Sequence, residues 1–120
     1  MNAAYGIALS GLNAYATRMG VSANNVANAV TPDYQPQEVA QTAQANGGVS
    51  VEVQNSDSGT VPVYSPDSGL ADSQGYVNLP NVDYAQEAVE QRMDVAGYKA
   101  NAAVIKTLAA MDKDLLNITA

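Results

Sequence analysis

Carboxylates are almost the only side chains in this sequence that could do acid–base or metal chemistry. The 120 residues include no His and no Cys, which removes the commonest general base, the commonest metal ligand and every thiolate nucleophile. Asp57, Asp67 and Asp72 each lie in a Ser- and Gly-rich stretch that suggests calcium, but none begins the Asp-x-Asp-x-Asp-Gly loop of an EF-hand. We therefore expect solvated turn aspartates, no bound metal or cofactor, and a protein that is not an enzyme.

The charge balance of the chain bears on its partners. Five Lys and Arg residues stand against twelve Asp and Glu residues, a formal net charge of −7. Binding of nucleic acid needs clustered cations that neutralise phosphates, so no nucleic-acid partner is expected. No run of eighteen apolar residues predicts membrane insertion, and the first residues lack the basic region of a cleaved signal peptide. Residence in the cytosol and export without signal cleavage both stay open.

The chain divides by composition into three segments, 1–32, 33–82 and 83–120. In the first, apolar or small residues recur every three or four positions, which predicts a long helix with a heptad seam. The seam consists of Tyr5, Leu9, Leu12, Ala16, Met19, Ala23, Val26 and Val30. Thr31 and Pro32 are expected to end the helix, because the residue before a proline avoids the α conformation. Arg18 is its only charged side chain, so we expect this helix to be enclosed by others.

The last segment predicts a second long helix. Asp83 is the expected N-cap, with Gln86 completing a capping-box-like pair, and Asp83 and Glu87 are acids of the kind that helix starts favour rather than a catalytic pair. The seam consists of Val89, Met93, Ala96, Ala100, Val104, Leu108, Met111, Leu115 and Ile118. From Asp83 to Ile118 the helix would run about 50 Å, too long for its own chain to cover. The two seams could form a core within one chain or between chains, and the charge-poor first helix favours the second.

The middle segment predicts a small β element. Residues 48–53 alternate apolar and polar side chains as a half-buried strand does. Residues 60–64 form a second strand with Pro62 at an edge position, and residues 55–59 between them are expected to be a hairpin loop. Residues 76–80 form a short extended stretch before the second helix. The expected fold is mainly α with this β insert, its two long terminal helices forming an antiparallel coiled-coil-like pair.

Three motifs resemble one known family when taken together. Residues 23–28, Ala-Asn-Asn-Val-Ala-Asn, resemble the ANNxAN signature of flagellar rod, hook and related axial proteins. Residues 75–83, Gly-Tyr-Val-Asn-Leu-Pro-Asn-Val-Asp, resemble the GYVxxPNVD element of the proximal-rod branch. Residues 98–101, Tyr-Lys-Ala-Asn, followed by Thr107, resemble the YxAN…T pattern of that family's C-terminal helix. The order of all three, on two terminal helices around a small β insert, is fairly specific for the family.

The resemblance implies a structural subunit of the bacterial flagellar basal-body rod. Such subunits are exported unfolded by the flagellar type III export apparatus without a cleaved signal peptide. They then lie in the periplasm-spanning rod, where their terminal helices pack against copies and other rod subunits in a helical assembly. The alternative is a soluble helical adaptor or chaperone-like binding module linked to type III secretion, which would use the second helix as a groove ligand.

Two polar groups on the helices are candidates for contacts in such an assembly. Asn24, Asn25 and Asn28 could form a hydrogen-bond ladder between subunits, or could serve the end of the helix, where Asn is common. Tyr98 and Asn101 face one direction and could bond to a first helix, of the same or a neighbouring subunit. The residues expected at the assembly interface are Leu9, Leu12, Asn24, Asn25, Asn28, Tyr98, Asn101 and Leu108.

Overall fold

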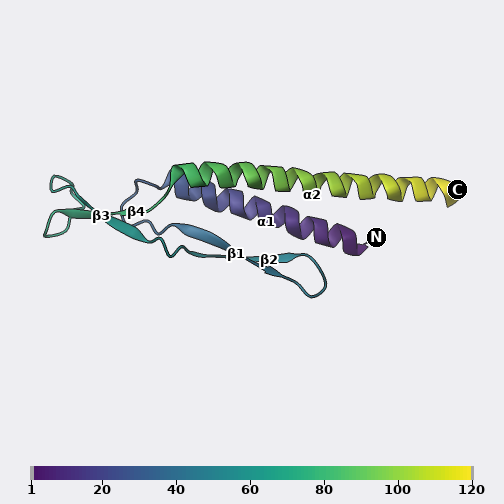
Figure 1. Cartoon of the computed structure of the whole chain (residues 1–120), viewed down its shortest axis with the longest axis horizontal. Coiled ribbons are helices and arrows are strands. Elements are labelled where there is room, and N and C mark those ends of the chain that lie inside the picture. The colour runs from purple at the N-terminus through teal and green to yellow at the C-terminus, as the bar shows by residue number, and fades with distance from the viewer. Residues whose placement is uncertain (1, 120) are drawn as a thin grey trace.

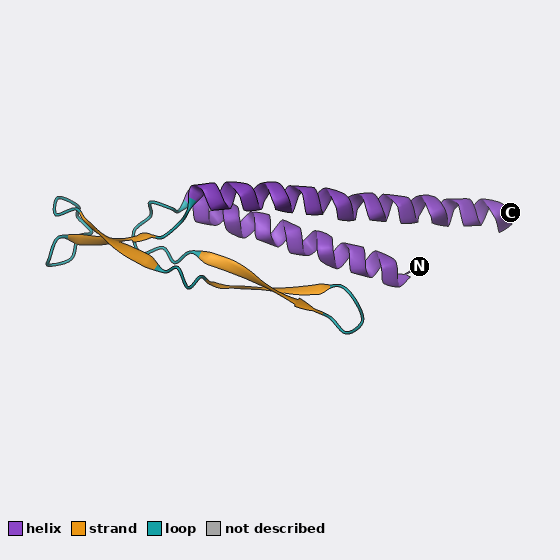
Figure 2. Cartoon of the chain, in the orientation of Figure 1, coloured by secondary structure: helices purple, strands orange, loops and turns teal. Residues whose placement is uncertain are grey.

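The computed structural model describes residues 2–119, which form an elongated chain of 77 × 25 × 19 Å. The elements in chain order are α1 (Asn2–Ala27), β1 (Gln37–Ala43), β2 (Val49–Asn55), β3 (Thr60–Tyr64), β4 (Tyr76–Pro80) and α2 (Tyr84–Thr119). The two helices lie antiparallel with the strands between them in sequence (Figures 1 and 2). The expected fold class, mainly α with a small β insert, is confirmed. Neither helix is both long and apolar enough, over the described residues, to cross a membrane.

Helix α1 is the middle layer of the molecule. It contacts α2 on one side and the hairpin of β1 and β2 on another (Figure 1). At the hairpin, the Val49 N–H donates to the Ser10 hydroxyl at 3.1 Å. The chain's own hairpin therefore supplies part of the enclosure that the charge-poor first helix was expected to need.

Helix α1 ends at Ala27, earlier than the expected stop at Thr31 and Pro32. The Asn28 side-chain amide donates to the Asn24 carbonyl at 3.0 Å, and the Thr31 hydroxyl donates to the Asn28 side-chain oxygen at 3.2 Å. Polar side chains that bond to nearby backbone compete with continued helix. Val30, the last residue of the predicted seam, lies beyond the helix end and is exposed.

The strands form two antiparallel hairpins, and the predicted pairing is wrong. Strand β2 pairs with β1, with Gln37 opposite Asn55 and Ala43 opposite Val49, and β3 pairs with β4, with Thr60 opposite Pro80. Residues 55–59 therefore connect two hairpins instead of closing one. The expected strand at 60–64 and the extended stretch at 76–80 are present, but as partners of each other, and β1 was not predicted.

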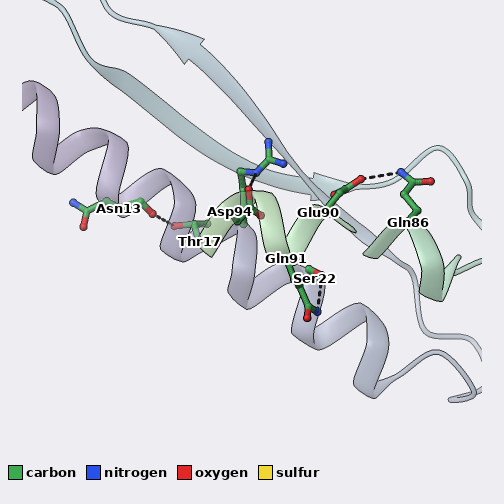
Figure 3. A network of polar contacts seen from close by, with 8 residues as sticks. Asn13, Thr17, Ser22, Gln86, Glu90, Gln91 and Asp94 are labelled. Atoms are coloured by element: carbon green, nitrogen blue, oxygen red, sulfur yellow. Dashed lines mark hydrogen bonds and ion pairs between the residues drawn. The ribbon is translucent and has the colours of Figure 1, made fainter. Parts of the chain in front are cut away.

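Helix α2 begins as its sequence indicates. The Asp83 carboxylate accepts hydrogen bonds from the Ala85 N–H at 2.8 Å and the Gln86 N–H at 3.1 Å, so the predicted N-cap is confirmed. The Gln86 side chain does not return to Asp83, and instead donates to the Glu90 carboxylate at 2.9 Å (Figure 3). Only one half of the expected capping box is therefore formed.

Candidate functional site

Polar contacts hold α1 to α2 in one antiparallel register. Four pairs of side chains are bonded in order along the two helices, with distances of 2.7–3.0 Å: Tyr5 to Asp112, Arg18 to Asp94, Gln91 to Ser22 and Asn25 to Glu87. Hydrogen bonds with fixed partners specify a register more strictly than apolar contacts, which tolerate sliding. Four specific polar bonds thus join the two helices of one chain and fix their register.

The Arg18–Asp94 ion pair is the most buried of these contacts. The Arg18 Nε donates to the Asp94 Oδ1 at 2.7 Å, and Asp94 is only 1 % exposed (Figure 3). Burial raises the pKa of Asp94 above its ordinary value, while the charge and hydrogen bond of Arg18 act in the opposite direction. The one cation of the first helix therefore has a partner inside the chain. Removal of Arg18 would leave an uncompensated buried carboxylate.

Asn25 is a hydrogen-bond centre at the closed end of the helix pair. It is 4 % exposed, and its amide donates to the Gln37 carbonyl at 2.8 Å and to the Glu87 carboxylate at 2.9 Å. Its carbonyl accepts from the Tyr34 hydroxyl at 3.1 Å and the Gln37 N–H at 2.9 Å. Burial, and then the charge of Glu87, raises the pKa of Tyr34. An asparagine side chain has two donors and two acceptor sites, so Asn25 is fully used in joining α1, the following loop, β1 and α2.

Two glycines let the helices approach closely. A side chain at Gly97 would overlap the Tyr15 ring, and a Cβ at Gly11 would lie 2.8 Å from the Asn101 side-chain oxygen. Asn101 also donates to the Gly97 carbonyl at 3.0 Å. The Tyr15 ring therefore lies on α2 at Gly97, and Asn101 lies on α1 at Gly11, where a larger residue would force the helices apart.

Most large members of the predicted seams do not form the contact between the two helices. The large apolar residues of the second seam are about half exposed or more, with Leu108 half-buried: Val89, Met93, Val104, Met111, Leu115 and Ile118. In the first seam, Leu9 is 51 % exposed, whereas four large members are half-buried: Tyr5, Leu12, Met19 and Val26. A core formed mainly by the seams within one chain is therefore wrong. The single chain leaves apolar stripes on its outside.

The eight predicted interface residues fall into three groups. Leu9 and Asn24 are exposed, and Asn25 is buried. The other five are half-buried: Leu12, Asn28, Tyr98, Asn101 and Leu108. The structure brings Asn101 to α1 of the same chain, while Asn24, Asn25 and Asn28 lie together at the other end of the helix pair. The sequence analysis missed the helix–helix contacts of Tyr15, Glu87 and Asp94. The lone positive charge of Arg18 was a signal for an acidic partner such as Asp94, and the other two contacts had no such signal.

A polar hollow of about 510 Å³ lies where the end of α1, the start of α2 and β1 meet. Glu38, Glu87 and Glu90 line it together with Arg18 and Asn25. Within residues 2–119, no three carboxylates are grouped so that they could hold a metal ion. Polar side chains of the hollow have partners within the chain: the Ser22 hydroxyl accepts from Gln91, the Glu87 carboxylate from Asn25 and the Glu90 carboxylate from Gln86.

The exposed apolar side chains of both helices are a surface of the kind that protein–protein contacts cover. The family described as "Flagella basal body rod protein" matches residues 7–35. The flagellar basal-body rod protein FlgC of Salmonella typhimurium is 40 % identical over 119 residues, covering 89 % of each chain. FlgC of Yersinia enterocolitica is 39 % identical with the same coverage, and FlgC of Borreliella burgdorferi is 29 % identical over 141 residues, covering 93 % of each chain.

This chain belongs to the family of flagellar basal-body rod proteins, and it is a structural rod subunit. The similarity to FlgC fits the proximal-rod branch that residues 75–83 resemble. The family decides between the two functional classes in favour of the structural subunit over the secretion-linked adaptor.

Proposed function

We propose that this chain is incorporated into the basal-body rod through the outward surfaces of its two helices, beside other rod subunits and copies of itself. The observation that carries the proposal is the exposure of the apolar seams next to a polar helix–helix contact. Met93 is 63 % exposed and Val89 is 57 % exposed. Full burial of a Val, Leu or Met side chain contributes about 1.5–3 kcal/mol, so covering several of them supplies a strong driving force for assembly.

The predicted interface residues take different parts in this proposal. Leu9 and Asn24 are open to direct contact with a neighbouring subunit. The half-buried residues Leu12, Asn28, Tyr98, Asn101 and Leu108 would contribute their exposed edges. Asn25 would act indirectly, by holding α1, β1 and α2 in the arrangement that presents the seams. Segments 1–32 and 83–120 then contain the assembly helices α1 and α2, and 33–82 contains the β region between them.

The same proposal includes where the chain lies in the cell and how it is exported. It is a non-enzymatic component of the periplasm-spanning rod, delivered by the flagellar type III export apparatus without a cleaved signal peptide. It binds no nucleic acid, which agrees with the net charge of −7, and it is not inserted in a membrane. The lack of His and Cys in the sequence supports a structural role, because it leaves no conventional nucleophile–base pair.

The experiment places a charge on the exposed seam. Met93→Asp should leave the helix content of the purified chain unchanged, because the site is exposed, and should sharply reduce incorporation into the rod, because assembly would bury an unpaired carboxylate. Met93→Leu keeps the site apolar and serves as the matched control. Each variant is expressed in cells that lack the wild-type chain, and motility and the amount in isolated basal bodies are measured.

Two results would contradict the proposal. Absence of the wild-type chain from isolated basal bodies would exclude a rod subunit. Equal incorporation of Met93→Asp and Met93→Leu would leave the rod assignment intact but would exclude this part of the seam from the interface.

A further inference from the structure

Four of the five cations in the sequence form a single row on α2. Arg92, Lys99, Lys106 and Lys113 are spaced seven residues apart, and all four are exposed. At a rise of about 1.5 Å per residue the row extends over about 30 Å. Residues at intervals of seven lie on one side of a helix. We call this row the basic stripe.

The cations of the basic stripe have no acidic side chain one turn away on their own helix. Surface helices commonly place Glu or Asp three or four residues from Lys, where the side chains meet. Here every residue at those positions along the stripe is Ala, Val, Leu or Asn. The ion pair of Arg18 with Asp94 is the only one among residues 2–119, so the four cations of the stripe form none within that part of the chain.

The region between the two helices is acidic. Residues 33–82 contain six of the twelve Asp and Glu residues and no Lys or Arg. Glu38 on β1 and Glu52 on β2 are exposed, while Val39 and Val51, which have the opposite orientation on their strands, are half-buried. Successive side chains of a strand point to opposite faces, so Glu38 and Glu52 share the hairpin face opposite to Val39 and Val51, with Glu38 also bordering the polar hollow. We call that face the acidic hairpin face.

The two charged surfaces lie on opposite sides of the molecule. Arg92 and Lys99 each precede by two positions a residue that contacts α1, Asp94 and Asn101 respectively. Two positions correspond to about 200° around a helix, so the part of the stripe formed by Arg92 and Lys99 lies on the side of α2 away from α1. The hairpin covers α1 from its other side (Figure 1). Helix α1 therefore separates the basic stripe from the acidic hairpin face of the same chain.

We infer that the basic stripe of one copy binds the acidic hairpin face of the next copy. The inference rests on the proposed function as a rod subunit and names the contact between successive copies. Opposite charges on opposite faces are complementary between chains but cannot meet within one chain. A contact between two different faces repeats from copy to copy and forms open filaments unless its rotation closes a ring. The repulsion between like faces disfavours other orientations.

The test measures self-association of the full chain by sedimentation velocity at two salt concentrations. The Debye length falls from about 30 Å at 0.01 M salt to about 3 Å at 1 M, so association should be present at the first and lost at the second. Lys99→Glu with Lys106→Glu should weaken association at low salt by about tenfold or more, since an exposed pair changes affinity about two- to fivefold and reversal also adds repulsion. Lys99→Arg with Lys106→Arg keeps the charge and should associate as the wild type does.

Charge restoration identifies the partner surface. Glu38→Lys with Glu52→Lys should also weaken association, and a chain carrying all four reversals should recover it, because the two faces are again complementary. Circular dichroism of every variant checks that the helices are intact. A wild-type chain that stays monomeric at low salt, reversals without effect, or failure of the fourfold variant to recover would each overturn the inference.

A cellular measurement separates this inference from the proposed function. If the chain with Lys99→Glu and Lys106→Glu is found in isolated basal bodies at the wild-type level, the stripe contact is wrong while the rod assignment stands. If the wild-type chain is missing from basal bodies, the proposed function itself is wrong.

Discussion

Substitution of Asn25 by Asp tests whether one side chain holds α1, β1 and α2 together. The change keeps the shape of the side chain and replaces a donating amide by a carboxylate that only accepts. In the native chain the amide faces two acceptors, the Gln37 carbonyl at 2.8 Å and the Glu87 carboxylate at 2.9 Å. After Asn25→Asp, both acceptors would face a negatively charged oxygen in a buried position.

The expected loss of stability follows from these contacts. A buried polar group that loses its partner costs about 1–3 kcal/mol, and two acceptors lose theirs here, while repulsion by the Glu87 carboxylate adds to the loss. The bonds that the Asn25 carbonyl accepts from Tyr34 and from the Gln37 N–H would survive. We therefore expect Asn25→Asp to lower the free energy of unfolding by about 2–5 kcal/mol. For a small protein with a urea dependence of about 2 kcal/mol per molar, the midpoint falls by roughly 1–2.5 M.

The assay is urea unfolding followed by far-ultraviolet circular dichroism at neutral pH. Asn24→Asp is the matched control, because it is the same chemical change at the exposed neighbouring position and should alter stability by no more than about 0.5 kcal/mol. Adding Glu87→Gln to Asn25→Asp supplies an amide that can donate to the new carboxylate and should recover at least about 1 kcal/mol. Equal midpoints for the Asn24 and Asn25 variants would refute the assignment of Asn25 as the centre of this contact.

The remaining predictions concern the contact between the two helices. Gly97→Ala should destabilise the chain by about 1–3 kcal/mol in urea unfolding, because the new methyl group would overlap the Tyr15 ring, which outweighs the gain in helix propensity. Gly20→Ala meets nothing within 4 Å and should stabilise by up to about 1 kcal/mol, so equal effects of the two would contradict the proposed packing. Burial raises the pKa of Asp94 above 3.8, so the folded state binds the carboxyl proton more tightly than the unfolded state does. The protonated carboxyl therefore adds to the stability of the chain at low pH, and this addition is lost as the pH rises through the raised pKa. Asp94→Asn should remove that contribution, and a stability difference from wild type that does not change between pH 3.8 and neutral pH would show that the Asp94 pKa is not raised.

The two helices were predictable because their signals are long and local. Apolar spacing over many turns defines a helix, and the Asp83 cap depends only on residues up to Gln86. The early end of α1 at Ala27 was missed because the competing bonds of Asn28 and Thr31 are side-chain choices. Their residue types make such bonds possible without making them necessary.

The strand pairing could not be predicted from local pattern. Strand β1 has the sequence Gln-Glu-Val-Ala-Gln-Thr-Ala, in which Val39 is the only large apolar residue, so it gives almost no alternating signal. It is a strand because β2 pairs with it and α1 covers the hairpin. These contacts join residues far apart in the sequence. The turn-like sequence at 55–59 is compatible both with a hairpin loop and with a connection between two hairpins, so it could not distinguish the two pairings.

The sequence also could not predict which face of each helix contacts the other helix. A heptad seam shows that an apolar stripe exists, but it does not identify what covers the stripe. The residues that set the register are polar, and Arg18 had twelve Asp and Glu residues as possible partners. The choice of Asp94 depends on the matched position of Tyr15 against Gly97 one turn away, which is a property of both helices together.

Polar residues join α1 to α2, while many apolar residues stay on the surface, because an assembly subunit needs apolar surface for contacts with its neighbours. If the seams of α1 and α2 had paired within the chain, little apolar surface would remain to drive association with neighbours. Polar pairs such as Arg18–Asp94 and Asn25–Glu87 set the register of the helices, but hydrogen bonds add little net stability because they replace bonds to water. The isolated subunit is then held in one arrangement by a weakly stabilising contact, and binding to neighbours must supply the rest. Its unfolding midpoint should therefore rise as copies associate, in proportion to the apolar seam that they cover.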